Sequence, residues 1–212
     1  MISHMKDVYQ GGPSPEKADA TLILVHGRGA SAENMLDLYQ ALGRSKIAAV
    51  APQAPGGTWY PHSFMAPLAE NQPYLDNALQ QIDALVGDLL DRGIPAEKIA
   101  LLGFSQGACL ATEYALRHPR RYGGLMVLTG GYIGPPGIER SDDGTFQGMP
   151  AFLGVNDPDA HVPFERAKET ADVLKRMKAR VELRRYPDMP HAVNDDEIKE
   201  CQKLLDTIAK GR

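Results

Sequence analysis

Short apolar runs alternate along the chain with segments in which apolar residues recur every three or four positions. Several runs are apolar at nearly every position, a pattern typical of strands that are buried on both faces of a parallel sheet. Most of the segments between the runs are long enough to hold a helix. The runs predicted to be strands are residues 21–26, 47–52, 99–104, 125–129, 150–155 and 181–186.

The intervening segments show helical spacing. In residues 75–89 apolar residues recur at intervals of three or four, and Gly93 stands where the end of a helix is expected. Residues 198–208 follow an acidic first turn, which suits a helix N-terminus. Further helices are predicted over residues 35–42, 108–116 and 164–177. The alternation of strands and helices predicts an α/β fold in which helices cover both faces of a mainly parallel central sheet.

The chain has 212 residues and contains no internal repeat or low-complexity linker. That length suits one hydrophobic core. We therefore expect a single domain over residues 1–212, without a large cap domain, in which residues 1–12 are either flexible or form an edge strand. Residues 53–73 and 130–149 are long connections rich in Gly and Pro. Loops of that length in a compact domain are usually functional or mobile.

Composition and charge narrow the class of function. The formal net charge is -4 and no long basic run occurs, so no nucleic-acid partner is expected. No apolar stretch approaches the roughly 18 residues of a membrane span, and residues 1–10 lack the apolar region of a secretory signal. Cys109 and Cys201 lie in helical segments and are expected to be reduced core thiols. These features predict a cytoplasmic protein, which we expect to be a monomer or a homodimer.

One short motif carries the clearest chemistry. Residues 103–107 read Gly-Phe-Ser-Gln-Gly, which matches the G-x-S-x-G pattern of a nucleophile elbow. The apolar run 99–102 precedes the motif and the helix-forming stretch 108–116 follows it, as such a turn requires. The tight turn projects the serine hydroxyl away from the sheet and brings the two flanking positions together, so both should be glycine. Ser105 is therefore the predicted nucleophile of an α/β-hydrolase fold.

A serine hydroxyl needs a general base, and the base needs a carboxylate to orient it. In this fold the acid and then the histidine follow the serine, each after a later strand. His191 comes after the last predicted strand and before the last predicted helix, so it is the predicted base. His118 ends the helix after the elbow and is interpreted as a surface residue. His161 lies in the segment that should supply the acid, which is the wrong place in chain order for the base.

The acid should follow the strand at residues 150–155. Asp157 and Asp159 both qualify and spacing alone does not choose between them, whereas Asp188 follows the wrong strand. The series Asp157-x-Asp159-x-His161 also resembles the spacing of metal ligands. The glycine and distal glutamate of a calcium loop are missing, however, and no other His/Cys/Asp cluster is near in sequence, so no metal is expected.

The oxyanion hole should use two backbone N–H groups. One is expected from Gln106, the residue after the nucleophile. The second is expected from Arg28 in the early loop 26–29, which reads His-Gly-Arg-Gly and whose glycines let backbone amides point inward. The same loop lacks the G-K-[ST] ending of a phosphate-binding loop, which argues against that interpretation.

Taken in order, these motifs resemble the phospholipase/carboxylesterase family of small α/β-hydrolases, which includes bacterial carboxylesterases and acyl-protein thioesterases. The resemblance runs from about residue 20 to the C-terminus, and it is carried by Leu-Val-His-Gly at 24–27, the pentapeptide at 103–107, Asp-x-x-Val-Pro at 159–163 and His191. It implies a Ser–His–Asp triad. Because the family's acid stands three residues before that valine, the resemblance implies Asp159 as the acid.

The early loop departs from the thioesterase branch of the family. That branch typically reads H-G-L-G-D, where this chain has His-Gly-Arg-Gly-Ala at residues 26–30. Residues 56–64 look instead like the bacterial carboxylesterase branch. In that segment Trp59, Tyr60 and Phe64 are expected either to contact the substrate or to anchor the loop on the core.

The expected function follows from the motifs and the resemblance together. They imply a serine carboxylesterase that hydrolyses small carboxylic acid esters through an acyl-enzyme, without a cofactor or a metal. Two alternatives stay open. One is a lysophospholipase or acyl-thioesterase that uses the same triad, and the other is a catalytically silent hydrolase fold that binds a small ligand. All three triad positions are filled, which favours an enzyme.

Overall fold

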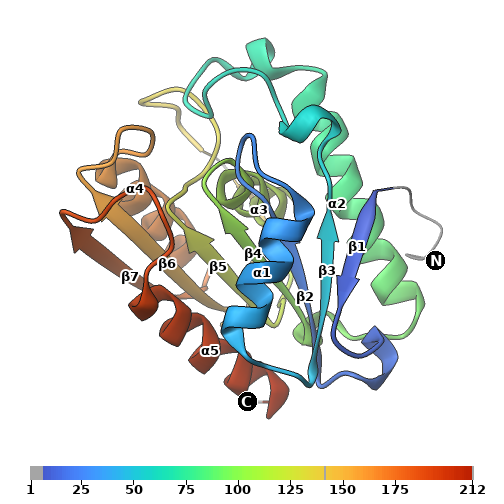
Figure 1. The fold of residues 1–212 in the computed structure, drawn as a ribbon. Helices are drawn as coiled ribbons and strands as arrows, with labels where there is room; N and C mark the ends of the chain where they lie inside the picture. Colours follow the sequence, from blue (N-terminus) through green and yellow to red (C-terminus); the bar gives the residue numbers. More distant parts are fainter. Residues whose placement is uncertain (1–6, 141, 212) are drawn as a thin grey trace.

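One central sheet runs through the molecule (Figure 1). Within residues 7–140 and 142–211, which the computed structural model describes, seven strands lie in the order β1-β3-β2-β4-β5-β6-β7. Neighbouring strands are parallel, except that β1 pairs antiparallel with β3 at one edge. The strands are β1 (Val8–Gly11), β2 (Ala20–Val25), β3 (Ile47–Pro52), β4 (Ile99–Phe104), β5 (Gly124–Leu128), β6 (Pro150–Asp157) and β7 (Arg180–Pro187).

The six strands predicted from apolar runs are all present, with ends that differ from the predicted ones by one or two residues at most. The mainly parallel α/β fold is thereby confirmed, and no large cap domain is evident in the described part of the chain. β1 was not among the apolar runs. Its central residues, Tyr9 and Gln10, are exposed, so no apolar run marks this strand in the sequence.

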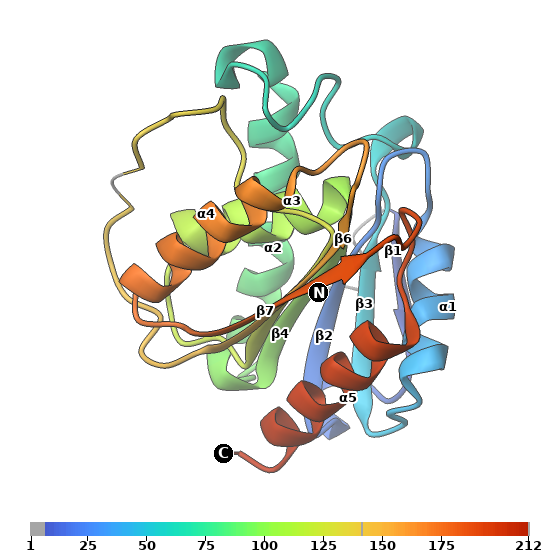
Figure 2. The same cartoon turned by 90° about the vertical axis from the view of Figure 1, so that its left-hand side faces the viewer.

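Helices cover both faces of the sheet (Figure 2): α1 and α5 lie on one face, and α2, α3 and α4 lie on the other. All five correspond to segments with predicted helical spacing. They are α1 (Ala32–Leu42), α2 (Tyr74–Asp91), α3 (Gln106–Arg117), α4 (Phe164–Arg176) and α5 (Asp195–Ala209). Short 3-10 turns occur in the connections, namely η2 (Pro15–Lys17), η3 (Pro55–Gly57), η4 (Leu68–Asn71) and η5 (Ala96–Lys98).

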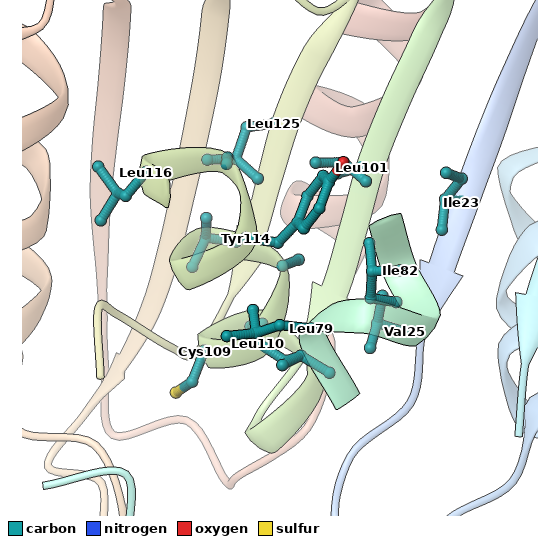
Figure 3. Packing of buried hydrophobic residues seen from close by; sticks show 14 of the residues in the cluster. Ile23, Val25, Leu79, Ile82, Leu101, Cys109, Leu110, Tyr114, Leu116 and Leu125 are labelled. Carbon is teal, nitrogen blue, oxygen red and sulfur yellow. The ribbon is translucent and has the colours of Figure 1, made fainter. Parts of the chain in front are cut away.

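Alternate side chains of one strand enter two different hydrophobic cores. On β2, Ile23 and Val25 belong to the core under α2, α3 and α4, whereas Leu22 and Leu24 belong to the core under α1 and α5. Burial on both faces explains why β2 is apolar at every position except Thr21. Each fully buried aliphatic side chain stabilises the fold by about 1.5–3 kcal/mol. Figure 3 shows the first core, with Ile23, Val25, Leu101 and Leu125 of the strands among Leu79, Ile82, Cys109, Leu110, Tyr114 and Leu116 of α2 and α3.

A capping box starts α5 and places a buried carboxyl group against the sheet. The Asn194 side chain accepts hydrogen bonds from the amides of Asp196 and Glu197, and Glu197 Oε2 accepts from the Asn194 amide at 2.9 Å. Glu197 is fully buried, and a Cβ added at Gly154 of β6 would lie 2.3 Å from its Oε1. Burial raises the pKa of Glu197 to about 7, against the lowering effect of the hydrogen bond from the Asn194 amide.

We expect Glu197→Gln to change the free energy of unfolding relative to wild type in a pH-dependent way. This difference should be up to about 3 kcal/mol more favourable to the variant at about pH 8 than at about pH 4. The folded state binds the Glu197 proton more tightly than the unfolded state, so the contribution of Glu197 to wild-type stability falls as the pH rises from about 4.5 to about 7. Glutamine keeps the capping acceptor but carries no charge. Urea unfolding across this pH range measures the difference, with Glu33→Gln in the exposed first turn of α1 as the control. Parallel pH profiles for Glu197→Gln and wild type would contradict the expectation.

Candidate active site

Ser105 lies at the sharp turn between β4 and α3. Its φ of 54° and ψ of -120° fall in a region of backbone conformation that non-glycine residues rarely adopt. The Ser105 amide donates to the carbonyl of Leu128 on β5 at 3.0 Å, and the Ser105 carbonyl accepts from the amide of Cys109 at 3.0 Å. This is the strand–turn–helix geometry expected of a nucleophile elbow.

The glycines on either side of Ser105 make this turn sterically possible. A Cβ added at Gly103 would lie 2.3 Å from the carbonyl oxygen of Gly107, and one added at Gly107 would lie 2.1 Å from the carbonyl oxygen of Val25 on β2. In both cases the obstacle is backbone, which cannot swing aside. Any side chain at either position would force β4, α3 and β2 apart.

A continuous chain of hydrogen bonds joins three side chains from different parts of the sequence. Ser105 Oγ lies 2.9 Å from Nε2 of His191, and Nδ1 of His191 lies 2.6 Å from Oδ2 of Asp159. Asp159 follows β6 and His191 follows β7, so the three residues meet at the carboxyl edge of the sheet. The side chain of Asp159 is 1% exposed, whereas that of His191 is 26% exposed. The carboxylate is therefore shielded from water while the imidazole stays accessible.

The surroundings of Asp159 favour its ionised form. Burial by itself raises the pKa of the Asp159 carboxyl group. The hydrogen bonds from His191 and from the amides of His161 (2.8 Å) and Val162 (2.9 Å) outweigh burial and hold this pKa below its ordinary value. An ionised Asp159 accepts the Nδ1–H of His191. That leaves Nε2 of His191 as the atom able to accept the proton of Ser105.

The two residues expected to form the oxyanion hole use their side chains to hold the loop at residues 53–73. Gln106 Oε1 accepts from the amide of Trp59 at 3.0 Å, and Gln106 Nε2 donates to the carbonyl of Tyr60 at 2.8 Å. The Arg28 guanidinium donates to carbonyl groups of the same loop. Within the described residues, neither the Arg28 nor the Gln106 backbone amide donates a hydrogen bond. Both amides are therefore free to bind a ligand.

A buried histidine fixes the early loop that carries Arg28. His26 Nε2 accepts from the amide of Ala54 at 3.0 Å, and its Nδ1 lies 2.7 Å from the carbonyl oxygen of Gly27. Burial lowers the pKa of His26, against the raising effect of the Gly27 hydrogen bond, so the ring stays neutral at pH 7. His26 thus ties the early loop to residue 54 and positions the backbone of the loop.

A cavity of about 540 Å³ opens beside Ser105. Tyr60 and Phe64 line it and are also 1% and 7% exposed, so each contributes both to the cavity wall and to the packing of the loop. Trp59 does not line this cavity. Its indole N–H donates to the carbonyl of His26 at 2.8 Å, and the two rings pack with centroids 4.9 Å apart. Of the two roles expected for Trp59, the structure therefore favours anchoring the loop over contacting the substrate.

Comparison with known proteins bears directly on these motifs. Residues 12–209 match the model of the phospholipase/carboxylesterase family. The chain belongs to this family. Acyl-protein thioesterase 1 of Saccharomyces cerevisiae is 30% identical to it over 90% of this chain and 93% of that protein. A phospholipase/carboxylesterase from Dyadobacter fermentans, known from its crystal structure, is 40% identical over 97% of both chains, with a TM-score of 0.89.

Membership of the phospholipase/carboxylesterase family confirms the resemblance inferred from the motifs. It makes the chain a hydrolase that acts on ester bonds. A further relative, acyl-protein thioesterase 1 of Mycosarcoma maydis, is 27% identical over 98% of both proteins. The relatives thus include proteins named for esters and proteins named for thioesters.

Three other residues considered from the sequence lie outside the hydrogen-bond chain of this phospholipase/carboxylesterase. Asp157 forms an ion pair with an arginine of β7. His118 is stacked on Tyr114 at the far end of α3, with ring centroids 4.7 Å apart. The ring of His161 meets that of His191 edge-on, with centroids 5.0 Å apart, and forms no hydrogen bond to it in the described part of the chain. His161 also lines the cavity beside Ser105.

The cysteines, the metal-ligating residue types and the helices bear on other functions that this family member could have. Cys109 and Cys201 are both buried and unpaired, and burial raises the pKa of Cys109 to about 12, so its thiol stays protonated at pH 7. Among residues 7–140 and 142–211, no cluster of three or more His, Cys, Asp or Glu side chains could hold a metal ion. Over the same ranges, no helix is long and apolar enough to cross a membrane.

Sequence reasoning missed Asn156, a buried side chain that contacts the loop carrying His191. It is fully buried near the end of β6, and its Nδ2 donates to the carbonyl of Pro190 at 2.6 Å and to that of Ala192 at 3.0 Å. One amide group thus holds the backbone on both sides of His191. The partners are 34 and 36 residues away in sequence, so no local pattern reveals them. The available signal is a polar residue in an otherwise apolar run, shortly before Asp159.

Asn156→Ala is expected to lower kcat by about 10–100-fold with a smaller change in KM. The loop that carries His191 loses both hydrogen bonds, so the imidazole is no longer held in one position. Loss of the two hydrogen bonds that the buried Asn156 side chain donates also costs about 1–3 kcal/mol of stability. Steady-state kinetics below the unfolding temperature separates the two effects. Ile82→Val, in the core at α2, serves as a destabilised control that leaves the His191 loop untouched. An equal fall of kcat in both variants would assign Asn156 a structural role only.

Proposed function

We propose that the protein is a serine carboxylesterase that hydrolyses small carboxylic acid esters, with Ser105 as nucleophile, His191 as general base and Asp159 as the acid that orients it. The observation that carries the proposal is the continuous hydrogen-bond chain of Ser105, His191 and Asp159, at 2.9 and 2.6 Å, beside an open cavity. A purely structural cluster would not need a serine in a strained turn next to a cavity.

In the first half of the reaction, Nε2 of His191 removes the proton of Ser105 as Oγ forms a bond to the ester carbonyl carbon. The carbonyl π electrons move to the oxygen and give a tetrahedral oxyanion. When the oxyanion collapses, the bond from carbon to the alcohol oxygen breaks. The alcohol leaves with the proton from Nε2, and an acyl-enzyme on Ser105 remains. The ionised Asp159 stabilises the imidazolium that forms in between.

In the second half, a water molecule takes the place of the alcohol. His191 removes a proton from this water, whose oxygen attacks the acyl carbon and forms a second tetrahedral oxyanion. Collapse breaks the bond to Ser105 Oγ, which recovers its proton from His191, and the carboxylic acid is released. The backbone amides of Arg28 and Gln106 would bind both oxyanions, and each such donor contributes roughly 10²–10³-fold in kcat. These steps use only groups of the chain and water.

The volume of the cavity lies in the range of small-molecule binding sites. Its volume is about 540 Å³, and the buried rings of Tyr60 and Phe64 form part of its wall. A second candidate function, hydrolysis of acyl thioesters, is favoured by the relatives named acyl-protein thioesterase 1. The same triad attacks thioesters, so the acyl chain and the leaving group distinguish the two functions.

A panel of p-nitrophenyl esters from acetyl to palmitoyl, paired with thioesters of the same acyl groups, tests the proposal. We expect kcat/KM to be highest for acetyl to butyryl esters and to fall by at least about tenfold for palmitoyl. Ser105→Ala provides the blank. A maximum at the palmitoyl thioester would establish the second candidate instead.

We also propose that the protein acts in the cytoplasm on free small-molecule esters, as a monomer or a homodimer, without a nucleic-acid partner. The two buried, unpaired cysteines suit a reducing compartment. The formal net charge of -4 disfavours binding to a polyanion. Fractionation of the source cells and light scattering on the purified protein test the location and the oligomeric state.

A further inference from the structure

Arg28 places a positive charge at the active-site cavity. Its Nη1 donates to the carbonyl of Pro61 at 2.9 Å, and its Nη2 donates to the carbonyls of Tyr60 and His62 at 3.0 and 2.8 Å. The guanidinium lines the same cavity as Ser105. Three hydrogen bonds to consecutive carbonyls hold the group in one position, and two of its five N–H groups have no partner among the residues that the structure describes.

No carboxylate neutralises this charge within the described residues. The Arg28 partners are backbone carbonyls, and no Asp or Glu side chain forms an ion pair with it. Nor does an acidic residue appear among the residues that line the cavity, whereas His62 and His161 do. Arg140, in contrast, is held by the carboxylates of Glu113 and Asp142. Over residues 7–140 and 142–211, the cavity lining therefore has one fixed cationic group and no carboxylate.

We propose that the site selects esters that carry an anionic group, a carboxylate or a phosphate, and that the Arg28 guanidinium is the residue that determines this specificity. The inference rests on the proposed ester hydrolysis and names its substrate class. The fixed positive charge suits both anions, and the two N–H groups that remain, one on Nε and one on Nη1, can each donate a charge-assisted hydrogen bond. Preorganisation by the three carbonyls lowers the cost of fixing the side chain when the anion binds.

The position of Arg28 also limits where the anion lies in the substrate. The same residue is expected to bind the oxyanion through its backbone amide, so its guanidinium is at most one side-chain length from the reacting carbonyl. The anionic group should therefore be separated from the scissile ester by a short spacer. A charge at the end of a long acyl chain would lie beyond reach.

Matched pairs of esters test the proposal. The carboxylate arm compares monomethyl succinate with neutral dimethyl succinate, corrected for its two ester bonds. The phosphate arm compares 2-acetoxyethyl phosphate with neutral 2-methoxyethyl acetate. Acid release is followed by pH-stat titration at low ionic strength. We expect the wild-type ratio of kcat/KM, anionic over neutral, to reach about tenfold or more in at least one arm, and to fall on addition of salt.

Arg28→Gln should bring this ratio to about one, whereas Arg28→Lys should retain part of it because the charge remains. The ratio is the readout, since loosening of the loop lowers kcat/KM for both esters of a pair. Arg180→Gln is the matched control: this exposed arginine also donates to a backbone carbonyl, that of Gly148, but lies at the amino end of β7. It should keep the wild-type ratio.

The outcomes distinguish a failure of the anion specificity from a failure of the proposed esterase function. If Ser105-dependent hydrolysis occurs but the wild-type ratio is near one in both arms, or is the same in Arg28→Gln, the anion specificity is overturned and the esterase function stands. If wild type hydrolyses neither member of any pair faster than Ser105→Ala does, the proposed function fails and the specificity fails with it.

Discussion

Ser105→Ala is expected to lower kcat for a p-nitrophenyl ester by about 10⁴–10⁶-fold while leaving the fold and KM nearly intact. Alanine removes the only atom that forms the acyl-enzyme, but it fits the backbone of the turn about as well as serine. The residual rate would come from the oxyanion hole and from binding alone. Stopped-assay kinetics at high enzyme concentration, with thermal unfolding in parallel, measures both properties.

Ser63→Ala is the matched control, because Ser63 lines the same cavity. Its Oγ accepts from the amide of Met65 at 3.1 Å, and no hydrogen bond joins it to His191 within the described residues. We expect Ser63→Ala to lower kcat by less than about tenfold. A Ser105→Ala enzyme with more than a tenth of wild-type kcat would mean that another group attacks the ester.

The second large effect is expected at the acid. Asp159→Asn should lower kcat by about 10³–10⁴-fold, because an asparagine side chain no longer stabilises the imidazolium and can hold His191 in the wrong tautomer. Asp159 Oδ1 also accepts from the amides of His161 and Val162. If the substituted amide oxygen takes over this position, its NH₂ group points at His191 and turns an acceptor into a donor.

Asp157→Asn decides between the two carboxylates that spacing left open. The Asp157 carboxylate pairs with Arg185 and has no hydrogen bond to His191 in the described part of the chain. Its replacement should change kcat by less than about fivefold, since an ion pair of this exposure contributes at most about 1 kcal/mol. Kinetics on both variants with one ester is sufficient. A larger loss in Asp157→Asn than in Asp159→Asn would reverse the assignment.

The sequence was most informative where burial is complete. β2, β4 and β5 are covered on both faces, so their apolar runs give their positions to within a residue. The elbow was equally clear, because close backbone contacts at Gly103 and Gly107 exclude every side chain. Chain order was enough to select His191. In each case a strong local constraint leaves a visible pattern.

What the sequence left open depends on contacts between distant segments. The pattern could not tell whether Trp59 contacts substrate or anchors its loop, because that depends on a hydrogen bond to His26, 33 residues away. Asn156 was missed for the same reason, since its partners lie on a later loop. Arg28 was expected to act through its backbone amide alone, and only the folded loop shows where its guanidinium lies.

Covalent labelling with a fluorophosphonate tests the central claim most directly, because this reagent reacts only with a serine that a neighbouring base activates. Peptide mass spectrometry of the labelled protein should find one adduct per chain, on Ser105, and none in the Ser105→Ala variant. Labelling should slow by orders of magnitude in Asp159→Asn. An enzyme that hydrolyses esters yet stays unlabelled, or carries the adduct on Ser63, would contradict the assignment of Ser105 as the nucleophile.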